Sequence, residues 1–242
     1  MTSISANLQG VRRRIAAACE ACGRAPAEVA LLAVSKTWPA ACVADAAAAG
    51  QRAFGENYVQ EGVAKVQTLS GLGLEWHFIG PLQSNKTRLV ANHFAWVHSV
   101  DRLKIAERLA MQRDAHLPPL NLCLQVNVSG EASKSGVEPE AIPVLARAVV
   151  ALPGIRLRGL MAIPEPTADQ SLLAARFATL RRLWEALRAE GMELDTLSMG
   201  MSDDLEVAIA EGATIVRVGT AIFGNRGAPG NLEHNMGQVD EN

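Results

Sequence analysis

The chain has 242 residues, which suits one large domain, and its 49% hydrophobic and 20% charged residues are typical of a soluble globular protein. A net charge of −2 and an aromatic content of 4% argue against a nucleic-acid partner, which needs a basic surface or stacking rings. No run reaches the roughly 18 apolar residues that span a bilayer, so we expect no membrane partner and a cytoplasmic location.

The first expected helix covers about residues 3–22 and contains a CxxC pair, Cys19 and Cys22. A CxxC can serve metal or redox chemistry, but no second CxxC or HxxxH completes a zinc site here, so we predict no metal. The basic run 12–14 precedes an apolar stretch that ends at Glu20, which is too short for a signal peptide.

Apolar, β-branched runs then alternate with helical patterns. A buried strand is predicted at 30–35, followed by an Ala-rich helix that begins near Pro39 and ends at Gly50. Further strands are expected near 53–54, 76–79, 95–98, 122–127, 157–162, 196–198 and 214–218. The longest helix is expected over about 169–190, where apolar residues keep a period of 3.6.

About eight strand–helix units in a chain of this length favour an α/β fold, a single closed (β/α)8 TIM barrel with an extra N-terminal helix. No linker divides the chain, so we expect one domain over residues 1–242, with a flexible tail over about 227–242. In such a barrel the active site lies at the carboxyl ends of the strands. The residues that follow each strand are therefore the candidates.

Lys36 follows the first strand. Burying a lysine at the end of an apolar strand costs free energy, so the position calls for an explanation. One interpretation is a side chain that extends to the barrel rim. The other is a lysine at the barrel mouth that is able to form a Schiff base.

Polar residues also follow the second, third and fifth strands. After the second, Glu56 and Asn57 open a helix, and capping is the simple interpretation. After the third, a functional site and a helix cap are equally good interpretations of the polar side chains, which are His77, Gln83, Asn85 and Lys86. The loop at 129–136, which includes Lys134, is long, small and polar, as a ligand-covering loop would be.

The ends of the seventh and eighth strands predict a phosphate site. Asp203 has the spacing to cap the next helix, which leaves the Ser202 hydroxyl and nearby amides for a ligand. Gly219 permits close approach of the backbone, and Thr220 adds a hydroxyl. Loops after these two strands are the usual phosphate site of the fold, although each segment alone also fits a simple turn.

Arg217 lies in the eighth strand between two valines. Strand residues alternate between faces, so Arg217 points into the barrel if Val216 and Val218 face the helices. A buried arginine beside a phosphate loop needs an acceptor. The alternative is an internal salt bridge with a carboxylate of a neighbouring strand.

Seven segments together resemble the pyridoxal phosphate homeostasis proteins, a family that resembles the barrel domain of alanine racemase standing alone. They are AVSKTWP at 33–39, FGENYVQE at 54–61, HFIGPLQSNK at 77–86, VNVSGEASKSG at 126–136, GLMAIP at 159–164, LSMGMSDD at 197–204 and VRVGTAIFG at 216–224. The segments span most of the chain, and the first and the last two are highly specific in combination.

The resemblance implies that the cofactor is pyridoxal 5′-phosphate (PLP), held as a Schiff base on Lys36. It implies that the remaining cofactor-binding residues are Asn57, Met199, Gly200, Ser202, Arg217, Gly219 and Thr220. In this arrangement Ser202, Gly219 and Thr220 hold the phosphate, Met199 and Gly200 line the phosphate loop, Arg217 faces the pyridine nitrogen, and Asn57 lies close to the cofactor.

The arginine argues for little or no turnover. A guanidinium only donates hydrogen bonds, so it would leave the pyridine nitrogen unprotonated and weaken the ring as an electron sink. Alanine racemases resolve this with a tyrosine from a second domain, whereas this chain ends soon after its eighth strand. Its only tyrosine, Tyr58, belongs to the predicted second helix of the barrel.

The sequence therefore predicts a monomer that binds PLP, buffers it and passes it to PLP-dependent apoenzymes. Two alternatives remain open. One is a PLP-dependent amino-acid racemase that takes its acid from His77 or the loop at 129–136. The other, which rests on fold analogy alone, is a phosphosugar-type barrel enzyme without PLP, in which Lys36 is a plain electrostatic residue.

Overall fold

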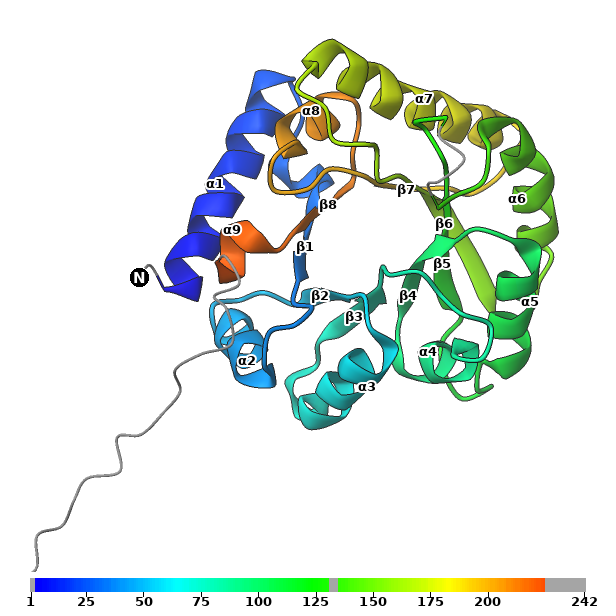
Figure 1. Ribbon diagram of the computed structural model, residues 1–242, viewed down its shortest axis with the longest axis horizontal. Coiled ribbons are helices and arrows are strands. Elements are labelled where there is room, and N and C mark those ends of the chain that lie inside the picture. Colours follow the sequence, from blue (N-terminus) through cyan, green and yellow to red (C-terminus); the bar gives the residue numbers. More distant parts are fainter. Residues whose placement is uncertain (1–2, 131–134, 225–242) are drawn as a thin grey trace, which may run out of the picture.

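The computed structural model describes residues 3–130 and 135–224. Eight parallel strands pair in chain order into a closed barrel, and the helices surround it (Figure 1). This confirms the predicted (β/α)8 barrel with an additional N-terminal helix. The tail predicted at 227–242 and residues 131–134 of the predicted loop lie outside the described residues.

The strands lie within about two residues of the predicted runs. They are β1 (Ala30–Val34), β2 (Ala53–Glu56), β3 (Glu75–Phe78), β4 (Trp96–Val100), β5 (Leu120–Gln125), β6 (Ile155–Met161), β7 (Thr196–Ser198) and β8 (Ile215–Val218). Pairing of β1 with β8 closes the ring and aligns Ala33 with Val218. The carboxyl ends of the first and last strands therefore lie side by side at one rim.

The helices alternate with these strands. They are α1 (Ile4–Ala21), α2 (Ala40–Ala48), α3 (Val59–Thr68), α4 (Thr87–His93), α5 (Leu103–Gln112), α6 (Ile142–Val150), α7 (Gln170–Ala189), α8 (Leu205–Ala210) and α9 (Thr220–Phe223). In the described part of the chain, no helix is both long and apolar enough to cross a membrane.

The additional helix α1 begins at Ser3, whose hydroxyl accepts a hydrogen bond from the backbone N–H of Ala6 at 3.2 Å. Its buried stripe consists of Leu8, Val11, Ile15 and Cys19. The stripe faces the barrel, and α1 lies against α8 and α9 outside β1 and β8 (Figure 1). Cys19 thus packs in the core, which explains one half of the CxxC without metal chemistry.

Alternation along the strands divides the core into two layers. The larger layer lies between the barrel and its helices and contains residues such as Phe54, Phe78 and Val97. Inside the barrel, one apolar cluster comprises Leu32, Val34, Ile79 and Ile215, and a second comprises Trp96, Cys123 and Met161. The remaining interior positions of several strands are polar, which makes the barrel interior part of the site described next.

Candidate functional site

Lys36 lies just beyond the carboxyl end of β1 and is half-buried. Across the β1–β8 seam, a Cβ added to Gly219 would lie 3.1 Å from the carbonyl oxygen of Val34. Only glycine lets the start of α9 approach β1 this closely without a shift. The barrel therefore brings Lys36 and the predicted phosphate loop to the same place on the rim.

The backbone around Lys36 is held on both sides by charged side chains of α3. The Lys65 ammonium donates a hydrogen bond to the carbonyl oxygen of Ser35 at 2.7 Å. The backbone N–H of Thr37 donates to Glu61 Oε1 at 2.5 Å. Thr37 has a φ of +69°, which is uncommon for a residue with a branched Cβ, so these contacts stabilise a strained turn directly after Lys36.

Lys65 is itself buried and forms an ion pair with Glu56, the last residue of β2, at 2.7 Å. The same Glu56 oxygen accepts a hydrogen bond from the Ser35 hydroxyl at 2.6 Å. Burial raises the pKa of the Glu56 carboxyl, although the bonds from Lys65 and Ser35 favour its charged form. The sequence suggested that Glu56 caps a helix, and this interpretation is wrong. Glu56 instead belongs to a buried network with Lys65 and Ser35, the residue that precedes Lys36.

The predicted phosphate residues Ser202 and Thr220 lie in the loop after β7 and at the first position of α9. Ser202 is half-buried and Thr220 is exposed, and neither hydroxyl forms a hydrogen bond with another described residue. The guanidinium of Arg14 on α1 donates to the carbonyl oxygen of Ser202 at 3.0 Å and pairs with Glu206. The additional helix therefore holds this loop in place.

The expectation that Asp203 caps α8 is wrong. Asp204 directly precedes the helix, and its carboxylate accepts a hydrogen bond from the backbone N–H of Met201 at 2.5 Å. That bond closes a tight turn over 201–204, so the acidic side chain stabilises the loop and not the first turn of the helix.

Met199 and Gly200 precede this turn. The Met199 side chain is fully buried in the core between barrel and helices, so only its backbone could contact a ligand. Gly200 has a φ of +93°, and a Cβ there would lie 2.6 Å from the Cβ of Ala208 on α8. The loop thus depends on glycine both for its backbone conformation and for its packing.

We expect Gly200→Ala to lower the free energy of unfolding by about 1–3 kcal/mol, because the alanine adds both backbone strain and a clash. Denaturant unfolding would measure the loss. Gly71→Ala is the matched control, since a Cβ at Gly71 meets nothing within 4 Å and its φ is not positive. Equal stability of the two variants would contradict the strain at Gly200.

Arg217 points into the barrel, as the alternation predicted, and is only 3% exposed. Its guanidinium crosses to β7 and β6, donating to the carbonyl oxygen of Ser198 at 2.6 Å, to the Ser198 hydroxyl at 2.8 Å and to the carbonyl oxygen of Ala162 at 2.8 Å. Burial lowers the pKa of Arg217 to about 10, which still leaves it charged at neutral pH. Within residues 3–130 and 135–224 it pairs with no carboxylate, so the alternative of an internal salt bridge is wrong.

His77 does not lie at the barrel mouth. It is buried within β3 near the amino ends of the strands, where its Nε2 lies 2.8 Å from a carboxylate oxygen of Glu75. Burial lowers its pKa, although Glu75 opposes the shift. The sequence grouped His77 with the polar residues that follow the third strand, whereas it lies inside that strand, which ends at Phe78.

Asn57 follows β2 at the mouth and is half-buried, and its Oδ1 is buried without a hydrogen-bond partner among the described residues. Beside it opens a hollow of about 560 Å³ at the carboxyl ends of β2, β3 and β4. Gln83 and Lys86 line this hollow, together with Arg102. An unsatisfied polar atom at the mouth is a position that a ligand can complete.

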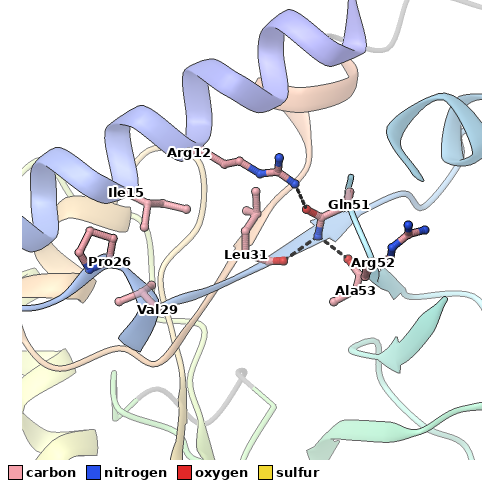
Figure 2. A pocket seen from close by; sticks show the side chains of 8 residues that line it. All are labelled: Arg12, Ile15, Pro26, Val29, Leu31, Gln51, Arg52 and Ala53. Atoms are coloured by element: carbon pink, nitrogen blue, oxygen red, sulfur yellow. Dashed lines mark hydrogen bonds between the residues drawn. The ribbon is translucent and has the colours of Figure 1, made fainter. Parts of the chain in front are cut away.

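A second hollow lies at the opposite end, between α1 and the starts of β1 and β2 (Figure 2). Gln51 crosses it, donating to the carbonyl oxygens of Leu31 at 2.7 Å and Ala53 at 2.8 Å. Arg12 in turn donates to the Gln51 side chain at 3.4 Å. The polar groups of this hollow therefore connect α1 to the barrel. The hollow lies at the end of the barrel opposite to Lys36.

Comparison with known proteins gives consistent matches over nearly the whole chain. The family model of the alanine racemase N-terminal domain matches residues 6–227. The pyridoxal phosphate homeostasis protein of Pseudomonas aeruginosa is 64% identical over 95% of this chain and 99% of its own length. That of Escherichia coli K12 is 56% identical over 93% of this chain and 98% of its own length.

A solved structure agrees with these matches. PipY from Synechococcus elongatus, solved with PLP bound, is 40% identical and superposes with a TM-score of 0.80. The match covers 92% of this chain and all of that one.

Proposed function

Since the chain belongs to the family of pyridoxal phosphate homeostasis proteins, we propose that it binds PLP at the carboxyl end of its barrel and serves the intracellular homeostasis of PLP. The observation that carries this proposal is the position of Lys36. A half-buried primary amine stands at the rim directly beside the loops that the fold uses for phosphate.

The residues at the rim fit PLP. The unpartnered Oδ1 of Asn57 and the hydroxyls of Ser202 and Thr220 are available to a polar ligand. The close packing of Gly219 on Val34 sets the loop after β8 against the strand that ends just before Lys36. We assign Lys36 to the Schiff base and the phosphate to Ser202, Gly219 and Thr220.

Arg217 would face the pyridine nitrogen. PLP supplies an aldehyde that a lysine can capture and a ring that withdraws electrons when its nitrogen is protonated. Arg217 remains charged and only donates hydrogen bonds, so it would hold that nitrogen unprotonated. The racemase alternative loses one of its two candidate acids, because His77 lies near the amino ends of the strands, and Tyr58 is 54% exposed at the start of α3.

We therefore assign the protein to storage and delivery. It would hold PLP with little or no turnover, act as a monomer in the cytoplasm and release PLP to PLP-dependent apoenzymes. The Schiff base suits this task because it sequesters a reactive aldehyde and hydrolyses reversibly.

The test is to load the protein with PLP, reduce it with borohydride and identify the modified peptide by mass spectrometry. We expect a yellow band before reduction, and a single PLP adduct on Lys36 after it. Unreduced protein, mixed with a PLP-dependent apoenzyme, should restore that enzyme's activity. An adduct on another lysine would contradict the site, and PLP that never transfers would contradict the delivery role.

A further inference from the structure

A chain of hydrogen bonds crosses the barrel interior from Arg217 to the floor. Arg217 donates to the Ser198 hydroxyl on β7, which lies 2.8 Å from His98 Nδ1 on β4. His98 Nε2 lies 2.9 Å from His77 Nδ1 on β3, and His77 Nε2 lies 2.8 Å from Glu75. Ser198, His98 and His77 are buried, whereas the Glu75 side chain is 52% exposed.

The chemistry of Arg217 and Glu75, its two ends, fixes the direction in which the hydrogen bonds of this chain are donated. The hydrogen bond from His77 holds the pKa of Glu75 below its usual value, so Glu75 is a carboxylate that only accepts. His77 must therefore donate from Nε2. Burial lowers the pKa of both His77 and His98, which keeps each ring neutral with one N–H.

With both rings neutral, the positions of the His98 ring proton and of the Ser198 hydroxyl proton are also determined. His77 Nδ1 accepts, so His98 donates from Nε2, and His98 Nδ1 then accepts the hydroxyl proton of Ser198. That hydroxyl turns its lone pairs toward Arg217, which can only donate. Every bond between Arg217 and Glu75 thus points toward the floor.

We propose that Glu75, His77, His98 and Ser198 are positioning residues that fix the orientation of the Arg217 guanidinium through this one-directional chain. The proposal rests on the proposed function, because Arg217 is the group that would meet the pyridine nitrogen. Without the chain, the Ser198 hydroxyl could rotate and direct its proton at Arg217. The guanidinium would then lose one of the three acceptors that hold it.

Two variants interrupt the chain at different depths, and a third controls for charge. Glu75→Leu removes the acceptor at the exposed end, and His98→Leu interrupts the middle. Asp195→Leu removes another carboxylate from the floor, where Asp195 pairs with Arg158 outside the chain. Because Glu75 is exposed, its variant should fold even if the His98 variant does not.

The first readout needs no cofactor. Nitrogen-15 NMR of the histidine rings should show His77 and His98 as Nε2–H tautomers in the wild type and in Asp195→Leu. Glu75→Leu should lose this preference at His77. A wild-type His98 protonated at Nδ1 would overturn the proposal, and a purely structural role of Glu75 would leave the tautomers unchanged.

The second readout uses the PLP-loaded protein. We expect Glu75→Leu and His98→Leu to weaken PLP binding by about five- to tenfold and to shift the visible band, while Asp195→Leu matches the wild type. Wild-type affinity and spectra in both chain variants would overturn the proposal. A wild type with no yellow band would instead contradict the proposed function, and the tautomers would still decide whether the chain has the stated direction.

Discussion

Lys36→Ala should abolish the yellow band that forms when the protein is mixed with PLP. Lys36 supplies the amine that we place at the join of β1 with the β8 loop, and alanine cannot form a Schiff base. Absorption spectroscopy before and after borohydride measures the effect. In the variant, we expect neither a band nor a stable adduct.

Two controls make this result specific. Lys86→Ala removes another lysine of the same rim, beside the hollow near Asn57, and should keep the wild-type band. A small primary amine added to Lys36→Ala with PLP should restore a yellow band that borohydride does not attach to the protein. A variant that keeps the wild-type band and adduct would show that Lys36 is not the anchor.

The sequence predicted the barrel well because the strands of a parallel sheet are buried on both faces. The run 30–34 reads as a continuous apolar segment, and the spacing between the predicted strands leaves room for one helix each. The polar segment 77–86 was interpreted as one group at the end of the third strand, although His77 lies inside β3. This grouping placed a histidine from the amino ends of the strands among the candidates for the opposite rim.

The same alternation predicted that Arg217 points inward, and the structure confirms it. It could not predict the partners. Which side chains share a layer depends on how strongly the strands tilt when the barrel closes, and no local pattern records that tilt. Ser198 and His98 lie 100 residues apart in sequence yet 2.8 Å apart in space.

Lys65 was missed for a related reason. Its spacing of four from Glu61 on α3 is typical of an exposed helical ion pair, which is the ordinary interpretation of such a pattern. The structure instead buries Lys65 against β2, where it also meets Glu56 and the backbone of Ser35. A Glu at the end of an apolar strand was the available signal, because a buried carboxylate needs a cation.

Lys65→Met should lower the free energy of unfolding by about 3–5 kcal/mol, because it leaves the Glu56 carboxylate buried without its cation. Denaturant unfolding measures the loss. Adding Glu56→Gln should recover most of it, since a neutral amide can still accept the hydrogen bond from the Ser35 hydroxyl. Arg147→Ala breaks the exposed pair with Glu190 and should cost below about 1 kcal/mol.

The functional consequence of Lys65→Met separates anchoring from positioning. Lys36 remains present, so the yellow band should still form and borohydride should still attach PLP to it. Because Lys65 no longer holds the carbonyl oxygen of Ser35, the backbone before Lys36 is less constrained and the band should appear more slowly. If the band forms at the wild-type rate while the free energy of unfolding falls as expected, the Lys65–Glu56 pair supports only the fold. An unchanged free energy of unfolding would contradict the burial of this ion pair next to Lys36.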